Sequence, residues 1–167
     1  DTQMALFTSY ALIRSKLKNK GQYIPNECMK EFSDAYHKWY KTQTQKQTDE
    51  DAGILMGNPD LFSRRFPGKA CLSALSMEKL GSKEYKINDS AGGGALMRVA
   101  PIGLAFFDNP DTAFETGLNN ALLTHGNPRG YLPAAGMAYL IADIIKGNDL
   151  EDSVQETISK IKEYGQD

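Results

Sequence analysis

The sequence predicts an all-α protein, and three observations support this fold class. Apolar residues recur at intervals of three and four along most of the 167 residues, and these segments end near glycines or prolines. No segment shows the alternation of apolar and polar residues that is typical of a half-buried strand, and there is no internal repeat. The length suits one domain, so we expect residues 1–167 to form a single compact multi-helix domain.

The first third of the chain predicts two amphipathic helices and a loop. The first helix covers residues 3 to 19 and ends at Gly21, and the second runs from Pro25 to about Thr42. The stripe that should face the core from the first helix is Met4, Leu6, Phe7, Tyr10, Ala11, Ile13 and Leu17. The polar segment TQTQKQTDED, residues 42 to 51, is expected to be a loop.

The middle of the chain is predicted to contain shorter elements. Residues 59 to 64 should form a short helix or turn, and ACLSALSMEKLG, residues 70 to 81, should form a helix that stops at Gly81. Residues 95 to 107 have the apolar character of a buried helix, but Pro101 lacks a backbone donor and must open or kink it.

Three helices are predicted in the last third. The first begins at Pro110 and ends at the segment THGNP. Residues 130 to 147 are almost uniformly apolar, which predicts a helix that is buried on most sides. The last helix, over residues 148 to 164, should bury one stripe, consisting of Leu150, Val154, Ile158 and Ile161.

Composition excludes several classes of protein. The net charge of −2 gives no electrostatic reason to bind bulk nucleic acid. No apolar run approaches the roughly 18 residues of a membrane span, and there is no signal peptide. Cys28 and Cys71 form no CxxC pair, which favours isolated thiols in a cytoplasmic protein over a disulfide.

The segment NDSAGGGALMR, residues 88 to 98, is the first candidate site. Three glycines directly before helix formers allow close backbone approach to a ligand, and the free N–H groups of a helix start favour anions. Glycines would equally allow two helices to cross closely, and the local sequence alone does not decide between ligand binding and helix packing. The segment matches neither a P-loop nor a dinucleotide-binding fingerprint.

His125 and the first two residues are further candidates. His125 closes an apolar helix, where it would act either as a C-terminal cap or as a ligand contact from the helix end. Asp1 and Thr2 have oxygens that suit Mg²⁺, although two such residues do not complete a site and helix capping explains them more simply. His37 lies among lysines and tyrosines without a partner ligand, so we expect it on the surface.

Four motifs in this order resemble the ADP-ribosylglycohydrolase family, the enzymes related to dinitrogenase-reductase-activating glycohydrolase. DTQMAL is similar to the end of the family's Thr-Asp-Asp-Thr-x-Met element, and RRFPGKACLSAL to a later segment. NDSAGGGALMRVAPIGLAF resembles its glycine-rich loop and the helix after it, and ALLTHGNPRGYLPAAG its Leu-Thr-His element. The resemblance covers most of the chain, and the family's fold is all-α.

The resemblance implies an activity and a set of residues. The family hydrolyses the glycosidic bond at the ribose of ADP-ribose attached to a protein side chain or small acceptor, and two Mg²⁺ ions usually organise the site. Asp1 would be the metal element's second aspartate and Thr2 its threonine. Residues expected around ADP-ribose are Ser90, Gly92, Gly93, Gly94 and His125. Met97 and Arg98 match the motif as well, and we expect packing and structural hydrogen bonds from them.

The chain also departs from the family's pattern. The family's catalytic acid lies upstream of the metal element, and its Asp-x-Asp-Thr element lies near the C-terminus; neither occurs here. We therefore expect a central portion of the fold, incomplete at both ends and inactive alone. Two alternatives stay open, a non-catalytic module that binds ADP-ribose or a nucleotide and a crystallin-like structural protein.

Overall fold

The computed structural model describes residues 2–165, and every regular element in this range is helical. The helices are α1 (Thr2–Lys18), α2 (Pro25–Thr44), α3 (Lys69–Leu75), α4 (Ala100–Ala105), α5 (Pro110–Leu122), α6 (Pro128–Ile145) and α7 (Leu150–Tyr164). Two 3-10 helices, η1 (Pro59–Leu61) and η2 (Leu96–Arg98), lie in the connections. The predicted all-α class is confirmed.

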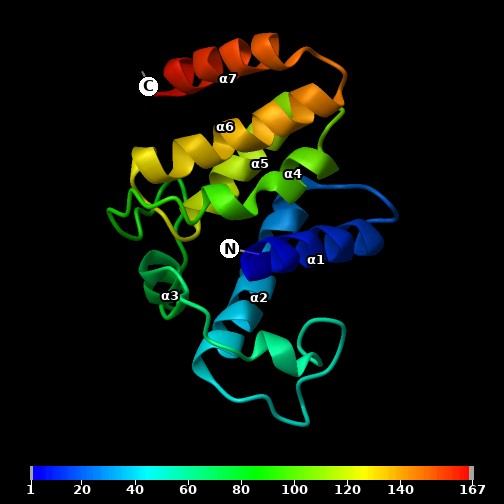
Figure 1. Ribbon diagram of the computed structural model, residues 1–167, viewed down its shortest axis with the longest axis vertical. Coiled ribbons are helices and arrows are strands. Elements are labelled where there is room, and N and C mark those ends of the chain that lie inside the picture. The colour runs from blue at the N-terminus through cyan, green and yellow to red at the C-terminus, as the bar shows by residue number, and fades with distance from the viewer. Residues whose placement is uncertain (1, 166–167) are drawn as a thin grey trace.

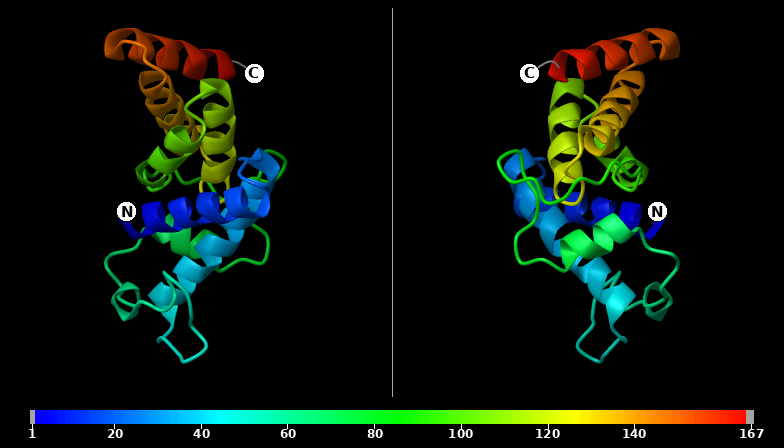
Figure 2. Two further views of the ribbon diagram at one scale, coloured as in Figure 1. Left: turned by 90° about the vertical axis from the view of Figure 1, so that its right-hand side faces the viewer. Right: turned by 90° about the vertical axis from the view of Figure 1, so that its left-hand side faces the viewer.

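The helices are stacked along the long axis of the molecule (Figure 1). At one end α7 lies on α6, which packs closely on α5 and also on α4. The pair α1 and α2 follows. α1 packs against α4 and η2, whereas α2 packs against α5 and α3. The loop after α2 forms the opposite end, as both side views show (Figure 2). The main core between these elements is built around Phe7, Phe32, Tyr36, Val99 and Ile102.

Prolines and asparagines set the starts of the helices. Pro25, Pro110 and Pro128 each open a helix, where a missing N–H costs nothing. The side chains of Asn109 and Asn127 cap α5 and α6 by accepting backbone N–H groups. The starts of α2 and α5 agree with the sequence prediction, whereas α6 begins at Pro128 and not at the predicted residue 130.

The segment predicted as one apolar helix over residues 95 to 107 is divided. Leu96–Arg98 forms η2, and α4 begins at Ala100 with Pro101 in its first turn. The proline therefore opens the second piece, one of the two outcomes expected from its missing donor.

The helix predicted over residues 70 to 81 is shorter than expected. α3 ends at Leu75, and the chain bends before Gly81. The N–H of Gly81 donates to the carbonyl of Leu123, and a side chain at Gly81 would overlap the carbonyl oxygen of Leu122. Gly81 therefore docks onto the end of α5, which a continuous helix would prevent.

Two polar residues of the predicted loop are instead buried in α2. The helix continues to Thr44, and Thr42 and Gln43 are buried. Thr42 donates to the carbonyl of Trp39 at 2.7 Å, and the amide of Gln43 donates to Gln3 Oε1 at 3.0 Å. The polar composition of this last helical turn predicted a loop. Its side chains can be buried because they form hydrogen bonds with α1 and with α2 itself.

Some predicted apolar stripes are only partly buried. In α1, Met4, Phe7 and Ala11 are buried, while Leu6, Ile13 and Leu17 are exposed. In α6 the first turns carry small buried residues, but Ile144 and Ile145 at its C-terminal end are exposed. The prediction that α6 is buried on most sides therefore holds only for its middle, around residues 134–138.

The face that α7 turns inward differs from the predicted stripe. Leu150 is 61% exposed and Ile158 41%, whereas Ser153 and Thr157 are buried. Ser153 Oγ donates to a carboxyl oxygen of Asp143 on α6 at 2.7 Å. A small hydroxyl pair at this contact lets α7 approach α6 closely. Val154 and Ile161 of the predicted stripe are half-buried, and Ile161 packs against the core, so the apolar periodicity identified the buried face only in part.

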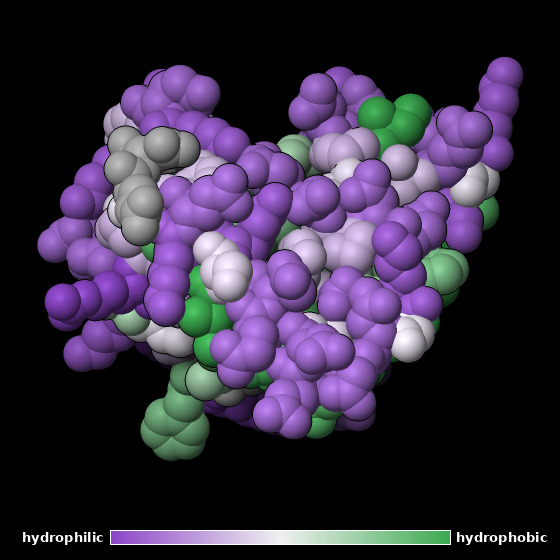
Figure 3. Space-filling view, turned by 90° about the horizontal axis from the view of Figure 1, so that it is seen from above, coloured by the Kyte–Doolittle hydropathy of each residue, from purple (hydrophilic) through white to green (hydrophobic). Residues whose placement is uncertain are grey.

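The outer surface around α7 is polar. Seen from above, the molecule shows mostly hydrophilic side chains with small separate hydrophobic areas (Figure 3). Between residues 2 and 165, no helix combines the length and the apolar character needed to cross a membrane.

Candidate functional site

Asn88 fixes the segment that leads into the three glycines. Its amide nitrogen donates to the carbonyl of Thr124 at 2.9 Å, and its amide oxygen accepts the N–H groups of Ser90 at 3.0 Å and Gly126 at 3.1 Å. One side chain thus joins the loop to the junction between α5 and α6. We call residues 88–94 the glycine loop and residues 124–130 the junction.

Two glycines of the junction allow the loop to lie directly on it. A Cβ at Gly126 would overlap the carbonyl oxygen of Asn88, and a Cβ at Gly130 would lie 2.6 Å from the carbonyl oxygen of Ser90. Real Cβ atoms do not approach backbone oxygens so closely, so only glycine permits this contact. The two predicted candidate segments, far apart in the sequence, therefore form one unit.

A second anchor lies at the edge of the loop. Asp89 Oδ1 accepts hydrogen bonds from Lys86 Nζ at 2.7 Å and Asn127 Nδ2 at 3.0 Å. These bonds, that of Lys86 first, lower the pKa of Asp89 below its usual value, so the carboxylate is charged at neutral pH. Asp89 is exposed and its contribution to stability is small.

The three glycines lie before a turn and not at the start of an α-helix. Gly92 and Gly93 are exposed and Gly94 is half-buried, and they lead through a turn into η2. The expected N-terminus of a long helix directly after them is thus wrong, because Pro101 delays the α-helix to Ala100. Any N–H groups offered here belong to an irregular loop and a 3-10 turn.

His125 lies beneath the glycine loop. Its side chain is 1% exposed, and Nδ1 shares a hydrogen bond with Thr124 Oγ1 at 2.9 Å. A Cβ at Gly94 would lie 3.4 Å from His125 Nε2, and one at Gly92 would lie 3.9 Å from it. The structure therefore brings His125 together with the glycines, as the sequence predicted, but behind them and away from solvent.

The imidazole of His125 is uncharged at neutral pH. Burial first, and then the positive charge of Arg98, lower the pKa of His125 from 6.5 to about 4. The alternative in which a charged His125 complements the helix dipole is therefore not supported. His37, in contrast, is exposed as predicted.

Arg98 connects the loop to the core. Its guanidinium is fully buried and donates to Asn120 Oδ1 at 3.0 Å and to the carbonyl of Asn120 at 2.7 Å. It also reaches Cys71 Sγ at 3.8 Å and lies 4.4 Å from the ring centre of Tyr36. Structural hydrogen bonds were expected of Arg98, whereas Met97, expected to pack, is 52% exposed.

Sequence reasoning missed Asn120, Tyr36 and Cys71 as neighbours of the site. Tyr36 Oη lies 2.7 Å from Thr8 Oγ1, and Asn120 Nδ2 donates to Tyr36 Oη at 2.8 Å. An asparagine in the middle of the apolar stripe of a helix is unusual and was the one available signal. Its partners could not be read from the sequence because they lie 22 and 84 positions away.

The predicted metal ligands form no metal site in the described residues. Asp1 lies outside them, and Thr2 is exposed at the start of α1. Within residues 2–165 no three histidine, cysteine or acidic side chains are grouped as a metal ion requires. The residues described therefore do not fit a pair of Mg²⁺ ions.

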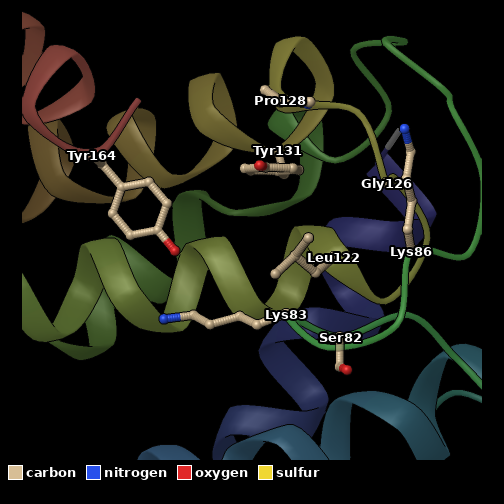
Figure 4. Close-up of a pocket in the computed structure, with 8 residues that line it drawn as sticks. All are labelled: Ser82, Lys83, Lys86, Leu122, Gly126, Pro128, Tyr131 and Tyr164. Carbon is tan, nitrogen blue, oxygen red and sulfur yellow. The ribbon is translucent and has the colours of Figure 1, made fainter. Parts of the chain in front are cut away.

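A cavity of about 360 Å³ adjoins the junction, and none of residues 90–94 lines it (Figure 4). Gly126 and Pro128 form part of its wall, and the rings of Tyr131 and Tyr164 lie across from Lys83. Lys83 Nζ pairs with Glu115 at 2.8 Å, which raises its pKa. No sequence motif indicated this cavity.

Comparison with known proteins agrees with the motifs. The model of the family described as ADP-ribosylglycohydrolase matches residues 1–167. Searches of curated proteins and of solved structures give no significant match. The family match spans the whole sequence and the helical fold is consistent with it, so this chain belongs to the ADP-ribosylglycohydrolase family.

Proposed function

We propose that the glycine loop binds ADP-ribose as part of an enzyme that hydrolyses the glycosidic bond between ADP-ribose and a protein side chain or small acceptor. The diphosphate would lie against the backbone N–H groups of Gly92, Gly93 and Gly94, with the hydroxyl of Ser90 at its edge. His125 would support this surface from behind, as a neutral group. Family membership supports the reaction class, and the loop supports the place of binding.

The observation that carries this proposal is that the fold does not need the three glycines. A Cβ at Gly93 would meet only the flexible end of Met97, at 3.8 Å, and one at Gly92 would meet nothing closer than 3.5 Å. None of the three has a positive φ. Packing and backbone conformation therefore leave them unexplained, unlike Gly126 and Gly130, and close approach of a ligand is the remaining reason for a bare backbone.

Hydrolysis itself needs groups that the described residues do not supply. Asp89 is the acidic residue of the loop, and its lowered pKa makes it a poor proton donor at neutral pH. The two Mg²⁺ ions expected for the family have no fitting donor set here, so we derive no step through them. We propose that the acid and the metal ligands belong to segments beyond residues 2–165 and that this chain binds without cleaving.

The same proposal implies a binding partner and a cellular location. The partner is ADP-ribose or an ADP-ribosylated protein, and we propose a cytoplasmic location because Cys28 and Cys71 are buried free thiols.

Calorimetry with ADP-ribose tests the binding surface. The unaltered chain should release or absorb heat with a saturable profile, and Gly93→Ala should weaken binding about tenfold or more by displacing the diphosphate. Gly68→Ala is the matched control, because an added Cβ there meets no atom within 4 Å and should leave binding unchanged. Absence of heat at millimolar ADP-ribose would exclude this function and leave the structural-protein alternative.

A release assay tests the division between binding and cleavage. Incubation with an arginine-ADP-ribosylated protein and Mg²⁺ should liberate no ADP-ribose if, as proposed, the catalytic acid lies outside residues 2–165. Release at a rate above buffer would show that this chain contains the catalytic acid and would overturn that part of the proposal.

A further inference from the structure

Among residues 2–165, Arg98 is a buried cation without a buried anion beside it. Its side chain is 0% exposed, and no Asp or Glu oxygen lies within 4.0 Å of it in residues 2–165, where the ion pairs involve other groups. Its three nitrogens each make one hydrogen bond, two to Asn120 and one to Cys71, and none to a carboxylate. Burying a charge without a counterion is strongly unfavourable, so its presence requires an explanation.

The surroundings of the guanidinium stabilise the charge but do not neutralise it. Tyr36 on α2 presents its ring, and Asn120 on α5 presents an amide oxygen and a carbonyl. Cys71 on α3 and His125 at the junction complete the contacts near the loop. Because the guanidinium is fully buried, its charge is weakly screened and its field extends towards the surface.

That nearest surface is the glycine loop. Cys71 Sγ, which accepts from Arg98, lies 3.5 Å from the position of a Cβ at Gly94, and His125 Nε2 lies 3.4 Å from the same position. One layer of side chains therefore separates the guanidinium from the loop backbone. The acid nearest in sequence, Asp89, is exposed and already bonded to Lys86 and Asn127.

We propose that Arg98 determines the specificity of the glycine loop for an anion, its buried charge favouring a diphosphate over an uncharged ligand. The identity of the anion as the diphosphate of ADP-ribose rests on the proposed function, whereas the preference for a phosphate-bearing group does not. Arg98 acts through the layer above it and is a positioning residue, not a catalytic one.

The state of His125 is consistent with this role. The charge of Arg98 is one of the two causes that lower the pKa of His125, the larger being burial. A neutral imidazole adds no charge of its own at the loop, so the attraction for an anion comes from Arg98 and the backbone N–H groups. When Thr124 donates to Nδ1, the proton of the ring lies on Nε2, which faces the glycines.

The variant Asn120→Asp tests the proposal in the full chain by placing a carboxylate 3.0 Å from Arg98 Nε without changing the shape of the side chain. Neutralising the charge should weaken binding of inorganic pyrophosphate about tenfold or more, measured by calorimetry. Asn119→Asp is the matched control, since it adds the same charge to α5 at a half-buried position outside these contacts and should bind as the unaltered chain does.

Histidine titration by NMR supplies a second measurement that does not need a ligand. The chain has two histidines, so the resonances of His125 and the exposed His37 are readily separated. The pKa of His125 should rise in Asn120→Asp and stay unchanged in Asn119→Asp, with His37 as the internal reference. An unchanged pKa of His125 in the folded variant would show that the charge of Arg98 does not reach the underside of the glycine loop, and it would contradict the inference.

The outcomes separate this inference from the proposed function. Equal pyrophosphate affinity in Asn120→Asp and the unaltered chain, or no pyrophosphate binding by either, overturns the role of Arg98. Pyrophosphate binding without ADP-ribose binding overturns the proposed function alone. If Asn120→Asp does not fold, Arg98→Lys and Arg98→Met replace it: the lysine variant should retain pyrophosphate binding and the methionine variant lose it, and equal binding by both contradicts the inference.

Discussion

His125 shows at the residue scale how position changes the chemistry of a side chain. At the end of an apolar helix a histidine is commonly a charged cap, but here the glycine loop covers the ring and Arg98 lies behind it. Both effects disfavour the imidazolium. The residue is therefore a neutral support for the loop at physiological pH.

This state predicts a pH dependence of stability. Because the folded pKa of His125 is about 4 and the unfolded value about 6.5, the unfolded chain binds the proton more tightly. The contribution of neutral His125 to the free energy of unfolding is therefore fully present above pH 6.5. It decreases by about 3 kcal/mol in total as the pH falls towards 4. Urea unfolding followed by circular dichroism at several pH values between 7 and 4 measures it.

The comparison with His125→Gln isolates this contribution from that of the carboxylates. Between pH 6.5 and 4, the free energy of unfolding should fall less in this variant than in the unaltered chain, because glutamine does not titrate. This holds whatever the stability of the variant at pH 7. An identical pH profile in both proteins would contradict the neutral, buried state of His125.

At the scale of elements, α7 shows that a helix can be predicted correctly and its buried face only in part. Of the predicted stripe, Ile161 packs against the core, but Leu150 and Ile158 are exposed. Ser153 and Thr157 are buried in their place. Thr157 bonds back to the carbonyl of Ser153, and Ser153 bonds to Asp143. Polar side chains that satisfy one another pack as well as apolar ones, and a hydropathy pattern does not register them.

Substitutions in α7 should reproduce this orientation. Ser153→Ala removes a buried bond to the carboxyl group of Asp143 and should lower the free energy of unfolding by roughly 1.5 to 3 kcal/mol. Leu150→Ala, at an exposed position, should change it by less than about 0.5 kcal/mol. Ser159→Ala is a matched control on the exposed face, and chemical denaturation compares the three. If Leu150→Ala were more destabilising than Ser153→Ala, Leu150 would belong to the buried face of α7, as the apolar stripe predicted.

At the scale of the whole molecule, one buried polar network links elements distant in the sequence. Thr8 of α1 and Tyr36 of α2 are joined through Asn120 of α5 to Arg98 of η2. All four side chains are buried. The network ties the pair of N-terminal helices to the helices that support the glycine loop, so it should influence the cooperativity of folding.

Tyr36→Phe tests the network. Loss of the hydroxyl removes the bonds to Thr8 and Asn120 and should destabilise the chain by about 2 kcal/mol in denaturant unfolding, because both partners stay buried. Tyr40→Phe, on the same helix and half-buried, should have an effect below about 0.5 kcal/mol. Equal effects of the two substitutions would show that the network contributes little.

The sequence by itself determined the helical class, the starts of α2 and α5, and the division at Pro101. These features depend on local chemistry: prolines fix φ and lack a donor, and apolar spacing follows the turn of a helix. Motif order also indicated the family. Only the tertiary structure decided that the glycine loop lies on the junction, that His125 is neutral behind it and that Arg98 is buried with no carboxylate beside it among residues 2–165. These features depend on contacts between residues that are far apart in the sequence.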